Sequence, residues 1–209
     1  MGYAIVTPLA AFAGSYLVGS IPTAYLVVRW LKRVDVRPVG SGNVGATNVT
    51  RVAGIGPGAA VFLTDLAKGF VAVGVLAGWY LHPLTPGLRF GCGLTAVVGH
   101  TFPIFLRFKG GKGVATTVGV LMGTMPMVAG ILLIVWGLVF AIWRYVSLGS
   151  IAAAIALPVA QTLTHRSRAE VVVGTLLAGL IMVRHRSNIK RLAQGTEHRA
   201  GRPRRLGGP

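Results

Sequence analysis

The segment VATTVGVLMGTMPMVAGILLIVWGLVFAIW, residues 114–143, decides how this chain is folded. It is almost entirely apolar, so it belongs inside a hydrocarbon layer rather than in water. It can form one membrane-crossing helix or, if it breaks between Gly123 and Pro126, a short helix followed by a longer one. The two possibilities give different numbers of membrane crossings, and the rest of the sequence chooses between them.

Composition places the whole chain in a membrane. The 209 residues are 53% hydrophobic and 12% charged, and the mean hydropathy is +0.68, which is too apolar for a soluble domain of this size. Several apolar runs are long enough to cross about 30 Å of hydrocarbon as helices. Because the runs are continuous rather than alternating, helices are favoured over a β-barrel. The runs cover residues 4–28, 57–81, 90–106, 114–143, 146–164 and 169–183.

The distribution of charge sets the topology. Twenty-one Lys and Arg against four Asp and Glu give a net charge of +17, and most of the basic residues lie in residues 29–51, residues 107–112, at Arg144 and in residues 184–205. A single crossing at 114–143 would put the first and last of these groups on opposite sides, against the tendency of basic segments to stay in the cytoplasm. The sequence therefore predicts an all-α polytopic membrane protein with seven transmembrane helices, the N-terminus outside and the C-terminus cytoplasmic.

The predicted fourth helix, of roughly ten residues, is too short to cross alone and needs shielding by neighbouring protein. We expect residues 1–200 to form one transmembrane domain. Residues 201–209, GRPRRLGGP, are expected to form a flexible basic tail.

A glycine-rich segment, DVRPVGSGNVGATNVTRVAG at residues 35–54, follows the first run. Its GxGxxG pattern, with Asp65 downstream, imitates a dinucleotide fingerprint, but the segment joins two apolar helices instead of lying in a βαβ unit. Its hydroxyls, amides and guanidinium on a glycine frame can grip phosphate, although an ordinary turn with helix caps is the alternative. The candidate phosphate ligands are Ser41, Gly42, Asn43, Thr47, Asn48 and Arg51.

A second segment, HTFPIFLRFKGGKGVATT at residues 100–117, breaks the apolar pattern with lysines and glycines. Glycines let backbone amides turn toward an anion, Lys109 and Lys112 add cationic donors, and a helix beginning at Val114 would add free amides at its N-terminus. A basic turn without a ligand is the alternative. A P-loop is excluded, because Lys112 is followed by glycine and a membrane span precedes it. The predicted anion-binding residues are Gly110, Gly111, Lys112 and Gly113.

Other polar positions have plainer interpretations. Asp65 and Lys68 lie three residues apart in an apolar run and are predicted to form a buried, structural pair. His100 is expected to be a hydrogen-bonded packing residue, with a catalytic role as the alternative. Ser150 is a possible ligand contact, although serine at a helix start is usually a cap. Cys92 lies within an apolar run and is assigned neither a disulfide nor a metal.

The third polar segment is HRSNIKRLAQGTEHR, residues 185–199, after the last apolar run. His185 and Asn188 lie three residues apart and would share one face of a helix. By itself this segment could also be a solvated basic anchor on anionic lipid.

Taken together, GSGNVGATNVTR, GHTFPIFLRFKGGKGVATTVG and HRSNIKRLAQGTEHR resemble the three motifs of the bacterial acyl-phosphate:glycerol-3-phosphate acyltransferases, the PlsY family, in order and spacing over nearly the whole chain. The resemblance implies a seven-helix protein of the bacterial inner membrane with its site facing the cytoplasm. It implies transfer of a fatty acyl group from acyl phosphate to the sn-1 hydroxyl of glycerol 3-phosphate, the first step of phospholipid synthesis. The products would be lysophosphatidic acid and inorganic phosphate.

The resemblance also implies roles for individual residues. Glu197 matches a glutamate that maintains structural integrity, and Lys112 with its glycines matches a phosphate-binding segment. The expected partners are the two substrates and membrane lipid; we expect no cofactor, no metal and a monomer. The residues matching the family's essential positions are Ser41, Arg51, Lys112, His185 and Asn188.

The chemistry of the motifs agrees with this reaction. Two phosphate-bearing substrates suit a site rich in Arg, Lys, hydroxyls and amides. Acyl phosphate is already activated, so the lack of a Ser–His–Asp or Cys–His set in the motifs is no obstacle. The proton could pass to His185 or to a substrate phosphate oxygen, and we favour an orienting role for His185.

Two other functions remain to be compared. The first is a membrane transporter for a small phosphate-bearing anion, but its site would be expected near the membrane midplane, whereas these motifs lie beyond span ends. The second, nucleic-acid binding, would explain the charge but lacks aromatic stacking residues in the motifs.

Overall fold

The computed structural model describes residues 3–80 and 84–201, so the predicted tail at 201–209 lies, apart from Gly201, outside the described residues. Every regular element in the described ranges is helical, as predicted. Two of them, η1 and η2, are short π- and 3₁₀-helical turns. The elements are α1 Tyr3–Ser20, α2 Thr23–Lys32, α3 Ala46–Ala53, α4 Ile55–Val71, η1 Ala72–Leu76, α5 Ala77–Tyr80, α6 Pro86–Thr101, η2 Ile104–Leu106, α7 Val114–Thr124, α8 Pro126–Trp143, α9 Val146–Leu163, α10 Arg168–Arg184 and α11 Arg186–Ala193.

The long helices have the length and surface of membrane-embedded helices. Large apolar side chains point outward from them, including Leu63, Ile134 and Val159, which are 61%, 64% and 56% exposed. Hydrocarbon accommodates such side chains and water does not. Among the described residues, four helical stretches are long and apolar enough to cross a membrane: Pro8–Lys32, Ile55–Tyr80, Pro126–Trp143 and Val146–Leu163.

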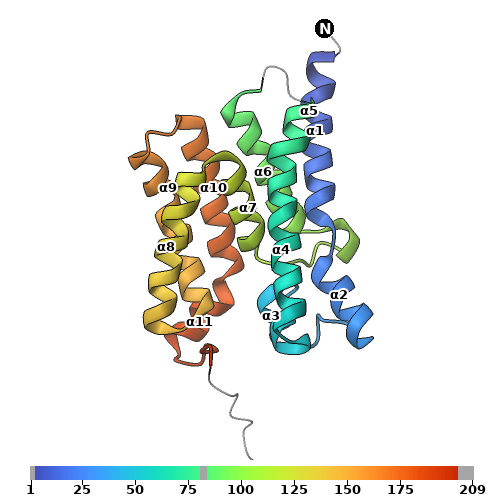
Figure 1. Cartoon of the computed structure of the whole chain (residues 1–209), viewed down its shortest axis with the longest axis vertical. Coiled ribbons are helices and arrows are strands. Elements are labelled where there is room, and N and C mark those ends of the chain that lie inside the picture. The colour runs from blue at the N-terminus through green and yellow to red at the C-terminus, as the bar shows by residue number, and fades with distance from the viewer. Residues whose placement is uncertain (1–2, 81–83, 202–209) are drawn as a thin grey trace, which may run out of the picture.

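The long helices stand side by side, and the short helices α2, α3 and α11 gather at the end of the bundle opposite the start of α1 (Figure 1). Helix α1 packs on α6, α4 on α7, and α9 on both α8 and α10. Buried side chains of α6, α7, α9 and α10 meet in one core, which fixes the three polar segments relative to one another. Its largest members are Phe90, Leu121, Met125, Leu157 and Leu177.

The apolar segment 114–143 is broken, as the charge distribution predicts. Helix α7 ends at Thr124 and α8 begins at Pro126, with Met125 between them at a non-helical φ of −143°. Proline fits the first position of a helix, because its missing N–H would have no helical partner there.

The short helix α7 is shielded by close packing against α4. A Cβ on Gly119 would lie 1.9 Å from the carbonyl oxygen of Leu66, and one on Gly69 would lie 2.1 Å from that of Thr116. The two backbones therefore touch, which only glycine permits at these positions.

Two apolar runs expected to be continuous are interrupted. The run 4–28 stops being helical at Ser20 and resumes at Thr23, because Pro22 cannot donate a helical hydrogen bond. The run 90–106 contains α6 only as far as Thr101; the residues after Pro103 form the separate turn η2. Both interruptions place polar backbone at the end of the bundle that carries the motifs.

Candidate active site

Residues 107–113, which we name the glycine loop, fold back onto the end of α6. The amide of Gly110 donates to the carbonyl of Thr101 at 3.2 Å, and the amide of Gly111 donates to that of His100 at 3.1 Å. These two amides therefore bond within the protein, and anion binding by Gly110 and Gly111 stays a prediction. Sequence alone could not show this, because a glycine amide can turn toward protein or ligand equally well.

Arg184 holds the same loop from the other side. Its Nε donates to the carbonyl of Gly111 at 3.2 Å, and its Nη2 donates to that of Gly110 at 2.9 Å. The guanidinium also lies 5.5 Å from the ring centre of Phe102. No motif or spacing in the sequence marks Arg184 individually, because it is one of several basic residues in the C-terminal group.

The remaining part of the predicted anion site is the start of α7. Gly113 occupies the N-cap position at a φ of 80°, and a Cβ there would lie 2.6 Å from the Val97 side chain. Glycine is therefore required on both conformational and steric grounds. The amides of the first turn of α7 have no helical partner, and they follow Lys112 directly.

Lys112 belongs to a network that joins two of the three motifs. Its Nζ donates to Oδ1 of Asn188, and Nδ2 of Asn188 donates to Oε1 of Glu197 at 2.8 Å. Ser147 Oγ donates to the same Oε1 at 3.0 Å, and Arg191 Nε donates to Oε2 at 2.7 Å. Glu197 thereby fixes the amide that receives Lys112, which agrees with the structural role implied for it.

The electrostatics of this network favour an anionic ligand. Burial lowers the pKa of Lys112 to about 8, the carboxylate of Glu197 opposes the shift, and the nearby charges of Arg191, Arg51 and Arg184 add to it. Burial tends to raise the pKa of Glu197, but hydrogen bonds from its three partners hold it below its usual value. Three arginines thus lie near Lys112, with a single carboxylate to balance the four positive charges, and a phosphate would relieve their mutual repulsion.

His185 is nearly enclosed, with 2% of its surface exposed. Its Nδ1 lies 2.8 Å from the carbonyl oxygen of Ile181. A carbonyl only accepts, so Nδ1 carries the hydrogen and Nε2 of the neutral ring is an acceptor. Burial and the charge of Lys112 lower the pKa of His185 to about 4, so the ring is neutral at pH 7.

The loop preceding α3 is organised by Asn48. The Asn48 side chain, 1% exposed, accepts from the amide of Ser41 at 2.7 Å and donates to the carbonyl of Val39 at 3.0 Å. Its amide thus shapes the loop, and the predicted contact of Asn48 with phosphate stays a prediction. By contrast, Ser41, Gly42 and Thr47 are exposed.

Arg51 brings the first motif to the other two. It is exposed and lies within electrostatic range of Glu197 and Arg191. Within the described part of the chain, neither the Arg51 guanidinium nor the Ser41 hydroxyl makes a hydrogen bond, so both can bind a ligand.

The comparison with known proteins decides the family. A sequence profile described as glycerol-3-phosphate acyltransferase matches residues 9–195. The glycerol-3-phosphate acyltransferase of Gloeobacter violaceus is 46% identical over 202 residues, which cover 93% of this chain and 96% of that protein.

The chain belongs to the glycerol-3-phosphate acyltransferase family. The corresponding protein of Myxococcus xanthus is 47% identical over 184 residues, covering 88% of this chain and 95% of that protein. The resemblance to the PlsY family seen in the sequence motifs is confirmed.

Solved structures of PlsY, an integral membrane glycerol 3-phosphate acyltransferase, have the same fold. The glycerol 3-phosphate form is 41% identical, with a TM-score of 0.85 over 93% of this chain and 96% of that one. The lysophosphatidic acid form is 38% identical, with a TM-score of 0.84 over 93% and 95%. Membership of this acyltransferase family favours the enzyme over the transporter considered from the sequence.

Some residues singled out by sequence lie beside this acyltransferase site without joining its network. Lys109 is exposed at the edge of the glycine loop. Ser150 donates to the carbonyl of Val146 in its own helix at 3.0 Å, whereas Ser147, one turn earlier, reaches Glu197. Among the described residues no group of three His, Cys, Asp or Glu side chains is placed to hold a metal ion.

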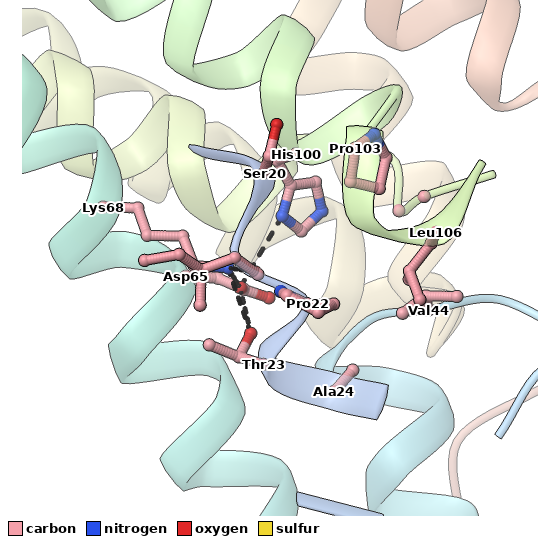
Figure 2. A pocket seen from close by; sticks show the side chains of 13 residues that line it. Ser20, Pro22, Thr23, Ala24, Val44, Asp65, Lys68, His100, Pro103 and Leu106 are labelled. Atoms are coloured by element: carbon pink, nitrogen blue, oxygen red, sulfur yellow. Dashed lines mark hydrogen bonds and ion pairs between the residues drawn. The ribbon is translucent and has the colours of Figure 1, made fainter. Parts of the chain in front are cut away.

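Asp65, Lys68 and His100 lie together in a separate small pocket beneath the glycine loop, between α4 and the break after α1 (Figure 2). The predicted buried pair is present, with Lys68 Nζ 2.7 Å from Asp65 Oδ1. His100 packs beside it, with its Nδ1 3.6 Å from Asp65 Oδ1.

Proposed function

We propose that this protein transfers a fatty acyl group from acyl phosphate to the sn-1 hydroxyl of glycerol 3-phosphate, releasing lysophosphatidic acid and inorganic phosphate. This is the first step of phospholipid synthesis. The relatives are named for the acceptor, and the donor is inferred from chemistry. An acyl phosphate brings its own leaving group and needs no covalent intermediate.

The observation that carries the proposal is the junction of Lys112, Asn188 and Glu197, with Arg51 within range. Three segments distant in the sequence supply cations and amides to one place. Each substrate delivers a phosphate, and charge builds on the carbonyl oxygen and on the departing phosphate during transfer. Preorganised cationic donors are suited to stabilise that charge.

Within this site we assign Arg51, Ser41 and Lys112 to phosphate binding, with Gly42, Asn43, Thr47, Gly113 and Asn188 beside them. His185 is a poor base at neutral pH, because its pKa is about 4. Its unprotonated Nε2 is suited to accept a hydrogen bond from the attacking hydroxyl and orient it. A phosphate oxygen of the substrate then takes the proton.

We further propose seven crossings of a bacterial inner membrane within a single domain of residues 1–200, with the N-terminus outside. The protein works as a monomer, and its site opens to the cytoplasm. The acceptor is a cytosolic anion and the donor has a hydrocarbon tail, so a site at the inner interface serves both.

Purified protein in detergent tests the reaction. Supplied with palmitoyl phosphate, it should release inorganic phosphate only when glycerol 3-phosphate is present, without added metal or ATP. Palmitoyl-CoA in place of palmitoyl phosphate should give no product. Acylation from the CoA ester, or no turnover with either donor, would refute the proposal.

A further inference from the structure

A buried polar cluster lies next to the proposed site and is not used by the reaction. Asp65 and Lys68 of α4 are 1% and 5% exposed, inside an apolar helix. Burying two charges costs more than their attraction returns unless further hydrogen bonds are made. Ionisable side chains within membrane-spanning helices are rare and often functional, so the further contacts of this pair are informative.

The cluster clamps the interruption between α1 and α2. Lys68 Nζ donates to the carbonyl of Ile21 at 2.5 Å and to Thr23 Oγ1 at 3.1 Å, and Thr23 donates to Asp65 Oδ1 at 2.6 Å. The carbonyl of Ile21 lies at the break before α2, where it also accepts from the amide of Thr23 at 3.0 Å. Asp65 Oδ1 thus accepts hydrogen bonds from both Thr23 and Lys68, and the dashed lines in Figure 2 connect it to Thr23 and His100.

His100, on the last turn of α6, connects the cluster to the glycine loop. Its Nδ1 lies 3.6 Å from Asp65 Oδ1, and its ring lies between Asp65 and the turn at Pro103 (Figure 2). Its carbonyl accepts from the amide of Gly111. A Cβ on Gly111 would lie 2.1 Å from His100 Nε2 and 2.7 Å from the carbonyl oxygen of Val44. The loop backbone therefore rests directly on the imidazole.

We propose that His100, oriented by Asp65, is a positioning residue that sets the place of the glycine loop and thereby aims Lys112 at the substrate phosphate. Arg184 bonds the carbonyls of Gly110 and Gly111, so the His100 ring and the Arg184 guanidinium together fix the position of the loop. Lys112 directly follows Gly111, and a small displacement of the loop moves its Nζ away from Asn188. The inference rests on the proposed function, because it assigns Lys112 to phosphate binding.

A double-mutant cycle tests the coupling. His100→Ala should lower kcat/KM for glycerol 3-phosphate about tenfold or more in the otherwise native protein, but less than about twofold in a Lys112→Ala background. Binding of glycerol 3-phosphate, measured by titration calorimetry without acyl donor, should show the same non-additivity. Equal losses in both backgrounds would overturn the inference.

Conservative variants protect the test against misfolding. Asp65→Asn keeps the shape of the side chain and an acceptor for Thr23, and His100→Asn keeps a donor toward Asp65. Both variants should lose less kcat/KM than His100→Ala, and their losses should remain coupled to Lys112.

Gln161→Leu removes a fully buried polar side chain near Glu170 and is the matched control. It should lower the unfolding temperature without changing kcat/KM.

The two hypotheses fail differently. Absence of turnover in the wild-type protein refutes the acyltransferase reaction. The positioning role is then tested by calorimetric binding of glycerol 3-phosphate to the single and double variants alone. Normal wild-type turnover together with native kcat/KM in folded His100→Ala and Asp65→Asn refutes the positioning role alone.

Discussion

Lys112 is the residue on which the contacts of the site converge. It donates a hydrogen bond to Asn188, is attracted by the carboxylate of Glu197 and lies near three arginines. Lys109, three residues earlier in the same loop, is exposed. We therefore expect Lys112→Ala to lower turnover by on the order of 10²-fold or more, because it removes a contact to developing charge. Lys109→Ala should have a much milder effect. Phosphate-release assays on folded protein compare the two, and a larger effect at Lys109 would contradict the assignment.

The lowered pKa of Lys112 predicts a pH dependence. Below about pH 8 its amine is protonated and attracts phosphate; as the pH rises through about 8 the charge is lost. The value of kcat/KM for glycerol 3-phosphate should therefore fall above about pH 8. In Lys112→Arg the residual kcat/KM should not fall there, because guanidinium stays charged. His185 should contribute no inflection near its ordinary pKa of about 6.5, since burial moves it to about 4.

At the level of single residues, sequence predicted chemistry better than orientation. Lys112, Asn188 and Glu197 were singled out and do form one network. Asn48 was assigned to phosphate, yet its amide is used by the backbone of its own loop. Arg184 was passed over although it bonds two loop carbonyls. Residue type and spacing do not reveal which of several possible partners a polar group meets after folding.

At the level of elements, the contact between α4 and α7 makes the clearest prediction. Gly119→Ala would place a methyl group against the carbonyl of Leu66 and should destabilise the protein by about 1–3 kcal/mol through overpacking. Gly130→Ala, on α8, meets no atom within 4 Å and should be neutral or stabilising by up to about 1 kcal/mol. Thermal unfolding in one detergent compares them. Equal midpoints would show that α7 can shift away from α4.

Helix breaks differed in how well sequence predicted them. The break between Thr124 and Pro126 was predicted because basic segments on both sides of it constrain the topology. The break at Pro22 has no such constraint, since apolar residues continue past it and proline is tolerated in membrane helices. The break is held by Lys68, which reaches it from α4 and bonds the carbonyl of Ile21 and the hydroxyl of Thr23.

At the level of the whole molecule, the bundle collects the motifs at one end. The break after α1, the break after α6 with the adjoining glycine loop, and α11 supply polar groups to this end, while α8 and α9 present apolar surface outward. From the net charge of +17 we expect electrostatic attraction of that end to anionic lipid and a raised local concentration of phosphate-bearing substrates.

The proposed orientation can be tested with two single-cysteine variants, one at the start of α10 and one just after α11. The natural Cys92 is fully buried and gives no background. Arg168 begins α10 and Gln194 follows α11, and both are exposed. Helix α11 lies at the end of the bundle opposite the one from which α10 starts (Figure 1). With seven crossings and the N-terminus outside, a membrane-impermeant maleimide should label Arg168→Cys in intact spheroplasts. Gln194→Cys should react only after the membrane is opened. The reverse pattern would place the Lys112 network outside the cell, away from cytosolic glycerol 3-phosphate, and labelling of both in intact spheroplasts would require an even number of crossings between Arg168 and Gln194.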